Sequence, residues 1–74
     1  MLAYLLISVT ENEQKVVDKI LELQEIKEAH ILFGEWDVIA KVSIDSPEGL
    51  SAFVMDKIRP LKEVKLTSTM IVAK

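Results

Sequence analysis

Two apolar, β-rich runs meet at Gly34, the first of only two glycines in the chain. They cover residues 30–33 and 38–42. A glycine adopts positive φ angles without the steric penalty that a Cβ brings, so the chain can reverse its direction here. This stretch therefore predicts a β-hairpin with Gly34-Glu35-Trp36-Asp37 at its tip. We expect the two carboxylates of the tip to face solvent on either side of the indole ring.

The remaining segments add two strands and two helices. Residues 2–9 form one continuous apolar run, and Thr10-Glu11-Asn12-Glu13 fits a capping box that begins a helix. Pro47 suits the first turn of a second helix, which Pro60 ends. We expect the other strands at residues 26–33, 38–44 and 64–72. The order predicts an α+β, ferredoxin-like βαββαβ sandwich, in which two helices cover one face of a four-stranded antiparallel sheet.

The second face of the sheet is left uncovered, because both helices lie on the first. Alternation along the strands predicts which side chains lie on this open face. It assigns a half-apolar set of side chains to that open face, together with part of the first strand: Leu32, Ile39, Lys41, Thr67, Thr69 and Ile71. Half of the 74 residues are hydrophobic, which is high for a domain of this size. We therefore expect a homodimer that buries this face, sheet against sheet.

Length, cysteine content and charge limit the classes of function that the chain can have. The 74 residues suffice for a single domain covering 1–74, and the chain has no cysteine, which fits a reducing cytoplasm. The net charge is −3 and the basic residues are scattered, which disfavours direct binding of nucleic acid. The apolar run at the N-terminus is too short to span a membrane and lacks the features of a signal peptide.

The polar residues indicate no enzyme. His30 is the only histidine, no serine lies in a known nucleophile motif, and we predict neither a metal nor a cofactor. Glu35 and Asp37 could share a proton only if the turn is wide, so two solvated carboxylates are the better explanation of this pair. Thr67 and Thr69 offer two hydroxyls on one face of the last strand, although threonine is also a common strand former.

Two motifs together resemble the effector-binding domain of the Lrp/AsnC family of amino-acid-responsive transcription regulators. That family has a Gly-x-aromatic-Asp turn between its second and third strands and a Thr-x-Thr in its last strand. Gly34-Glu35-Trp36-Asp37 and Thr67-Ser68-Thr69 reproduce both motifs in the same order. The resemblance covers essentially the whole chain.

The resemblance implies a small-molecule effector, an amino acid, bound between dimers. In relatives the domain pairs sheet to sheet, and the dimers assemble into rings, commonly octamers of four dimers. Carried over, the ligand-binding residues are Gly34, Trp36 and Asp37 from one subunit with Thr67 and Thr69 from another, while Glu35 occupies the variable position of its motif. Two departures are Trp36, where tyrosine or phenylalanine is usual, and Glu63, where glycine is frequent.

Relatives also carry an N-terminal helix-turn-helix, whereas this chain starts at its first strand. We therefore expect a stand-alone sensing domain in the cytoplasm that acts through a partner such as a full-length paralogue. Two alternatives stay open at this point. One is a structural or scaffolding oligomer, and the other is a small dimeric ferredoxin-like enzyme.

Overall fold

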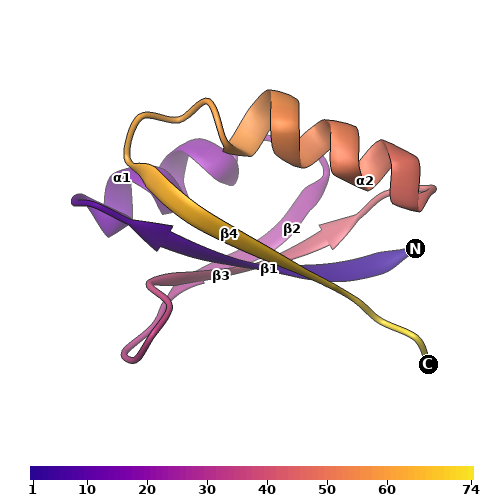
Figure 1. Ribbon diagram of the computed structural model, residues 1–74, viewed down its shortest axis with the longest axis horizontal. Coiled ribbons are helices and arrows are strands. Elements are labelled where there is room, and N and C mark those ends of the chain that lie inside the picture. The colour runs from indigo at the N-terminus through magenta and orange to yellow at the C-terminus, as the bar shows by residue number, and fades with distance from the viewer.

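The strands and helices follow one another in the order expected from the sequence. A computed structural model describes residues 1–74 (Figure 1). None of its helices has the length and apolar character that crossing a membrane requires. The elements are β1 (Leu2–Val9), α1 (Glu13–Ile20), β2 (Ile26–Ile31), β3 (Val38–Ser43), α2 (Pro47–Phe53), the π-helical segment η1 (Val54–Ile58) and β4 (Val64–Ile71).

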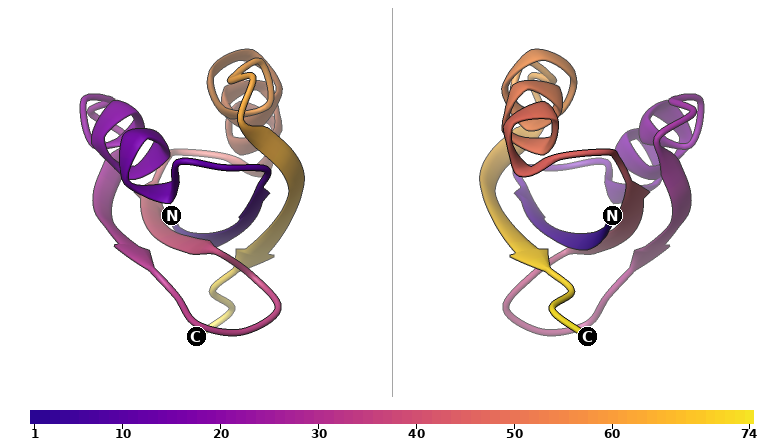
Figure 2. Two further views of the ribbon diagram at one scale, coloured as in Figure 1. Left: turned by 90° about the vertical axis from the view of Figure 1, so that its left-hand side faces the viewer. Right: turned by 90° about the vertical axis from the view of Figure 1, so that its right-hand side faces the viewer.

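The four strands form one antiparallel sheet in the order β2-β3-β1-β4. Both helices lie on the same side of this sheet, as the end-on views show (Figure 2). The ferredoxin-like sandwich is therefore confirmed. Strands β2 and β4 are the two edges of the sheet, and β1 and β3 lie between them.

The core lies between the helices and the inner face of the sheet. Alternate residues of the central strands point into it, with Leu5, Ile7 and Val38 fully buried. The helices contribute apolar stripes whose residues recur at helical spacing. Fourteen buried hydrophobic residues form this cluster: Ala3, Leu5, Ile7, Val16, Val17, Ile20, Ile26, Val38, Ala40, Val42, Leu50, Phe53, Val54 and Ile58.

The start of α1 differs from the expected capping box. The N-cap residue is Asn12, in a left-handed conformation with φ 57°, and no side chain caps the helix. Thr10 instead pairs with the beginning of β4: its backbone N–H and its hydroxyl donate to the Glu63 carbonyl, at 2.9 and 3.4 Å. Because this residue continues the sheet, it cannot cap the helix.

The second helix begins as the sequence predicts and ends just before Pro60 as expected, but its last turn is π-helical. The Ser46 side chain accepts a hydrogen bond of 3.0 Å from the Gly49 N–H, and Pro47 opens the first turn. Further along, the Arg59 N–H bonds to the Val54 carbonyl, five residues earlier, at 2.9 Å. This is the hydrogen bond of a π-helix, which is rare and occurs frequently at functional sites.

A β-bulge in β4 overturns part of the expected open face. Val9 pairs with Val64 but Ser8 pairs with Leu66, so Lys65 is an extra residue without a partner. An extra residue reverses the alternation of every side chain beyond it. Thr67, Thr69 and Ile71 were therefore assigned to the wrong face: they pair with Ile7, Leu5 and Ala3 of the core and lie on the helix side.

The open face is apolar nevertheless. Ile39 and Lys41 lie on it as expected, beside the outward residues of β1. The bulge places Leu66 and Met70 there in place of the threonines, and these side chains are 57% and 47% exposed.

Candidate functional site

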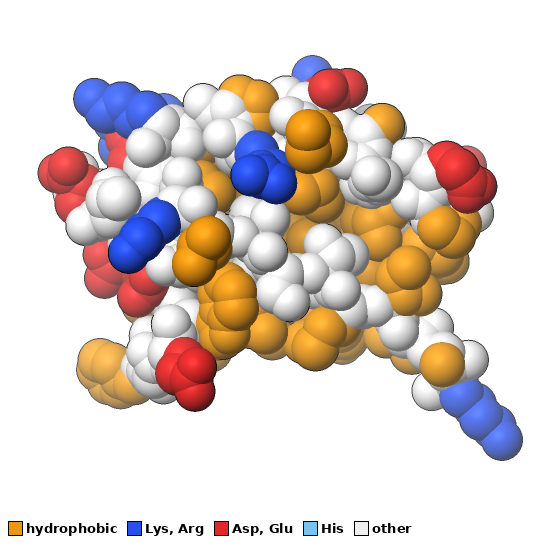
Figure 3. Space-filling model, in the orientation of Figure 1, with side chains coloured by type: hydrophobic (Ala, Val, Ile, Leu, Met, Phe, Trp, Pro, Cys, Tyr) orange, Lys and Arg blue, Asp and Glu red, His pale blue; other side chains and the backbone are white.

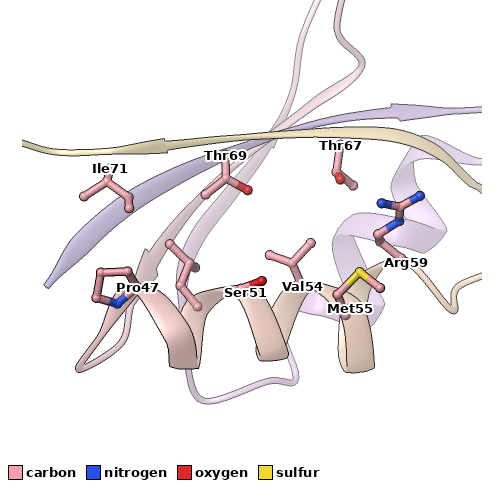
Figure 4. A pocket seen from close by; sticks show the side chains of 9 residues that line it. Pro47, Ser51, Val54, Met55, Arg59, Thr67, Thr69 and Ile71 are labelled. Atoms are coloured by element: carbon pink, nitrogen blue, oxygen red, sulfur yellow. The ribbon is translucent and has the colours of Figure 1, made fainter.

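A groove of about 350 Å³ runs between the second helix and the edge strand β4. Its volume lies at the lower end of the range for small-molecule sites. Figure 4 shows the groove from close by. The helix side contributes Pro47, Leu50, Ser51, Val54, Met55 and Arg59, and β4 contributes Thr67, Thr69 and Ile71.

The helix side of the groove contains a row of residues spaced by four, namely Pro47, Ser51, Met55 and Arg59. In a regular α-helix such a row drifts around the axis, because one turn holds 3.6 residues. The π-turn of η1 is wider and counteracts this drift at the end of the row. The last side chain of the row, Arg59, consequently still faces the groove.

The strand side of the groove contains both threonines of the Thr-x-Thr motif. Thr67, Thr69 and Ile71 point from β4 toward the helix (Figure 4). The β4 bulge is responsible, because it turns the hydroxyl row inward and the Leu66 row outward. The edge strand β4 thus presents hydroxyls to a partly open groove.

The groove changes character along its length. Pro47 and Ile71 lie at one end, Ser51 and Thr69 in the middle, and Arg59 lies beside Thr67 at the other end (Figure 4). In the space-filling view, hydrophobic side chains gather along this face while acidic ones lie toward its edges (Figure 3). The arrangement can accommodate a small molecule with an apolar part and a polar, anionic end.

The other half of the expected site is the loop of residues 32–37 between β2 and β3. It extends away from the helical layer in all views (Figures 1 and 2). Gly34 has φ 140°, which agrees with its predicted role in the reversal. Glu35 is exposed and Trp36 is half-buried, and the preceding Phe33 is the most exposed large hydrophobic side chain.

Asp37 is tied to the end of β1 rather than free in solvent. Its carboxylate oxygen Oδ2 accepts a hydrogen bond of 2.8 Å from the Val9 N–H, and its own N–H donates to the Ile7 carbonyl at 3.0 Å. Its carbonyl closes the loop by accepting from the Leu32 N–H at 2.8 Å. The expectation of two solvated carboxylates is therefore wrong for Asp37, since the loop folds back over the strand end.

Within one chain, the structure gathers only part of the sequence-derived set. Thr67 and Thr69 line the groove, whereas none of Gly34, Glu35, Trp36 and Asp37 does. Sequence reasoning missed Arg59, Ser51 and Met55. The signal that could have found them is the four-residue spacing that continues from Pro47, which marks the flank of the helix next to its buried stripe.

Two carboxylates outside the groove have perturbed pKa values. The pKa of Glu63 is lowered, mainly by the hydrogen bond from Lys15, whose Nζ lies 3.1 Å from Oε2. Glu63 is only 2% exposed, and its other oxygen, Oε1, has no hydrogen-bond partner. On the sheet, the hydrogen bond from His30 and the charge of Lys41 lower the pKa of Glu28. No group of three or more histidine or acidic side chains is arranged to hold a metal ion.

Comparisons with known proteins agree on one family. The sequence model of the Lrp/AsnC ligand binding domain matches residues 2–74. An uncharacterized HTH-type transcriptional regulator of Pyrococcus abyssi is 34% identical over 59 residues, which are 80% of this chain and 39% of that protein. The chain thus spans less than half the length of this curated relative.

Solved structures give the same result. The crystal structure of FFRP-DM1 is 39% identical, with a TM-score of 0.88 over 96% of this chain and 96% of that one. The transcriptional regulator NMB0573 of Neisseria meningitidis, solved in complex with L-methionine, is 18% identical. It has a TM-score of 0.89 over 99% of this chain and 49% of that one, and this likeness concerns the fold alone.

Proposed function

Since the chain belongs to the Lrp/AsnC ligand-binding domain family, a regulatory domain and not an enzyme, we propose that it binds an amino acid as a regulatory effector in the groove between α2 and β4. One observation carries this proposal. The hydroxyls of Thr67 and Thr69 line the same groove as an apolar surface and a cation, which suits the carboxylate and the apolar side chain of an amino acid. The fold neighbour solved with L-methionine supports an amino acid as the ligand class.

The turn of a second copy completes this site. The loop of residues 32–37 extends away from the groove of its own chain, with Phe33 exposed at its tip (Figure 2). Gly34 offers backbone groups to a ligand, and Trp36 offers an apolar cover. Asp37 uses Oδ2 for the Val9 N–H, so its second oxygen is the acceptor for the ligand's ammonium group, while Glu35 contributes charge at the rim.

Two contacts between copies follow from this arrangement. The open face of the sheet, with Ile39, Leu66 and Met70, pairs with the same face of a second copy and forms a dimer. The groove and the loop are different surfaces, so their contact is heterologous, and repeated heterologous contacts can close into a ring. The family resemblance favours a ring of four dimers. Ligand binding and ring assembly are then thermodynamically coupled.

The domain transmits its signal to a DNA-binding region and does not itself contact DNA. The net charge of −3 supports this division of labour, because a negatively charged domain repels the DNA backbone. The effector changes the assembly of the ligand-binding domains, and this change alters the arrangement of the DNA-binding regions.

A thermal-shift screen of the common amino acids tests the proposal. A ligand present at 100 times its dissociation constant adds about 2.7 kcal/mol to the stability, which is readily measured. Thr69→Val keeps the shape of the side chain and removes one hydroxyl, so we expect up to about tenfold weaker binding with an unchanged fold.

The matched control is Ser43→Ala, which removes a hydroxyl at the exposed end of β3, outside the groove. Its binding should equal that of the parent. If no amino acid shifts the parent protein, the sensing function is wrong and a scaffolding oligomer takes its place.

A further inference from the structure

Arg59 is the only charged side chain in the groove. The other eight lining residues are apolar or carry hydroxyls. Three ion pairs occur in the structure, Lys15–Glu63, His30–Glu28 and Lys41–Glu28, and Arg59 takes part in none of them. The groove therefore holds one positive charge without a protein counterion.

The fold fixes the backbone position that carries this charge. Arg59 is the residue whose N–H closes the π-turn on the Val54 carbonyl, and its guanidinium reaches toward the Thr67 end of β4 (Figure 4). Guanidinium and hydroxyl thus meet at one end of the groove, while Ile71 and Pro47 form an apolar surface at the other.

We infer that Arg59 binds the carboxylate of the ligand, and that the groove of a single chain recognises an apolar monocarboxylate whether or not it carries an amino group. This inference rests on the proposed function for the location of the ligand. A guanidinium offers paired N–H donors that match the two oxygens of a carboxylate, and such charge-assisted pairs are the strong ones.

The absence of acidic side chains from the groove lining sets the ligand class. An ammonium group needs a carboxylate or several carbonyl acceptors, and the lining provides only hydroxyls beside Arg59. Recognition of the amino group is then the task of the loop from another copy, through Asp37. The groove by itself accepts an amino acid and its deaminated counterpart alike, and it rejects an amide that lacks the carboxylate.

Three ligands with the same apolar side chain separate the contribution of the carboxylate from that of the amino group. L-Leucine has both charges, 4-methylpentanoate lacks the amino group, and L-leucinamide lacks the carboxylate. By isothermal titration of the full chain, we expect leucine and 4-methylpentanoate to bind, and leucinamide to bind at least about tenfold more weakly.

Arg59→Met should weaken the binding of leucine and of 4-methylpentanoate about tenfold to a hundredfold. Arg59→Lys should restore part of this affinity, because it restores the charge but not the paired donors. Lys62→Met removes a nearby exposed cation outside the groove and should change nothing. Changes in the methyl NMR signal of Ile71 on addition of 4-methylpentanoate would place that ligand in the groove.

The outcomes distinguish this inference from the proposed function. If leucine binds and 4-methylpentanoate does not, or if Arg59→Met binds leucine as the parent does, the inference is wrong while the amino-acid function stands. If 4-methylpentanoate binds in an Arg59-dependent manner and no amino acid binds, the inference holds and the amino-acid function fails. If none of the three ligands binds, the inference is overturned, and the amino-acid screen alone then decides the proposed function.

Discussion

Asp37 joins the loop to the end of β1, so its removal should cost stability even in the absence of a ligand. In Asp37→Ala the Val9 N–H loses its acceptor in a partly buried position. A hydrogen bond to a charged group contributes about 1.5–3 kcal/mol. We therefore expect a loss of about 2 kcal/mol in the free energy of unfolding. For a domain of this length that corresponds to a decrease of roughly 8–16 °C in Tm.

Asp37→Asn removes the charge of the side chain but keeps its shape, and so measures the contribution of the charge alone. An asparagine can still accept the Val9 N–H through its side-chain carbonyl, but a neutral hydrogen bond is roughly half as strong. This variant should lose about half as much stability as the alanine variant. Glu35→Ala is the control, because Glu35 is exposed, and it should stay within about 0.5 kcal/mol of the parent.

Urea unfolding followed by circular dichroism measures these differences. All variants must be compared at one protein concentration, because association between copies raises the apparent stability. If Asp37→Ala unfolds at the same urea concentration as Glu35→Ala, the hydrogen bond to Val9 contributes nothing and the structural role assigned to Asp37 is wrong.

Two further predictions concern the open face of the sheet and the buried carboxylate of Glu63. Ile39→Asp places an unpaired charge in the proposed dimer interface and should reduce the mass measured by light scattering to that of a monomer. The control Lys62→Asp should leave the mass unchanged. An unchanged mass for Ile39→Asp would exclude this face as the interface. The lowered pKa of Glu63 means that its ion pair with Lys15 stabilises the fold above the ordinary carboxyl pKa, and that this stabilisation is lost as the pH falls through the lower folded-state pKa. Glu63→Gln should therefore be less stable at pH 7 and should lose less stability on acidification to about pH 3, and equal slopes for both proteins would contradict this.

The order of the elements could be predicted because local periodicity determined it. The apolar run of β1, the Ser46-Pro47 helix start and Gly34 each carry a local signal with one dominant structural solution. No long-range information was required for these features.

The faces of β4 and the contents of the groove could not be predicted in this way. Whether Thr67 points inward depends on how β4 pairs with Ser8 and Val9, and nothing in the segment itself marks Lys65 as an extra residue. The role of Asp37 depends on an N–H that is distant in sequence. The location of Arg59 depends on a π-turn, which propensity rules do not anticipate.

The bulge at Lys65 makes substitutions and insertions in β4 act in different ways. On one strand, the hydroxyl row faces a cavity and the Leu66 row faces outward, and a single unpaired residue allocates the two rows. Point substitutions along β4 alter one surface at a time and can be selected independently. An insertion or deletion near Lys65 exchanges both surfaces at once. The length of this short segment therefore determines both surfaces of β4, whereas the identity of any one residue within it affects only one of them.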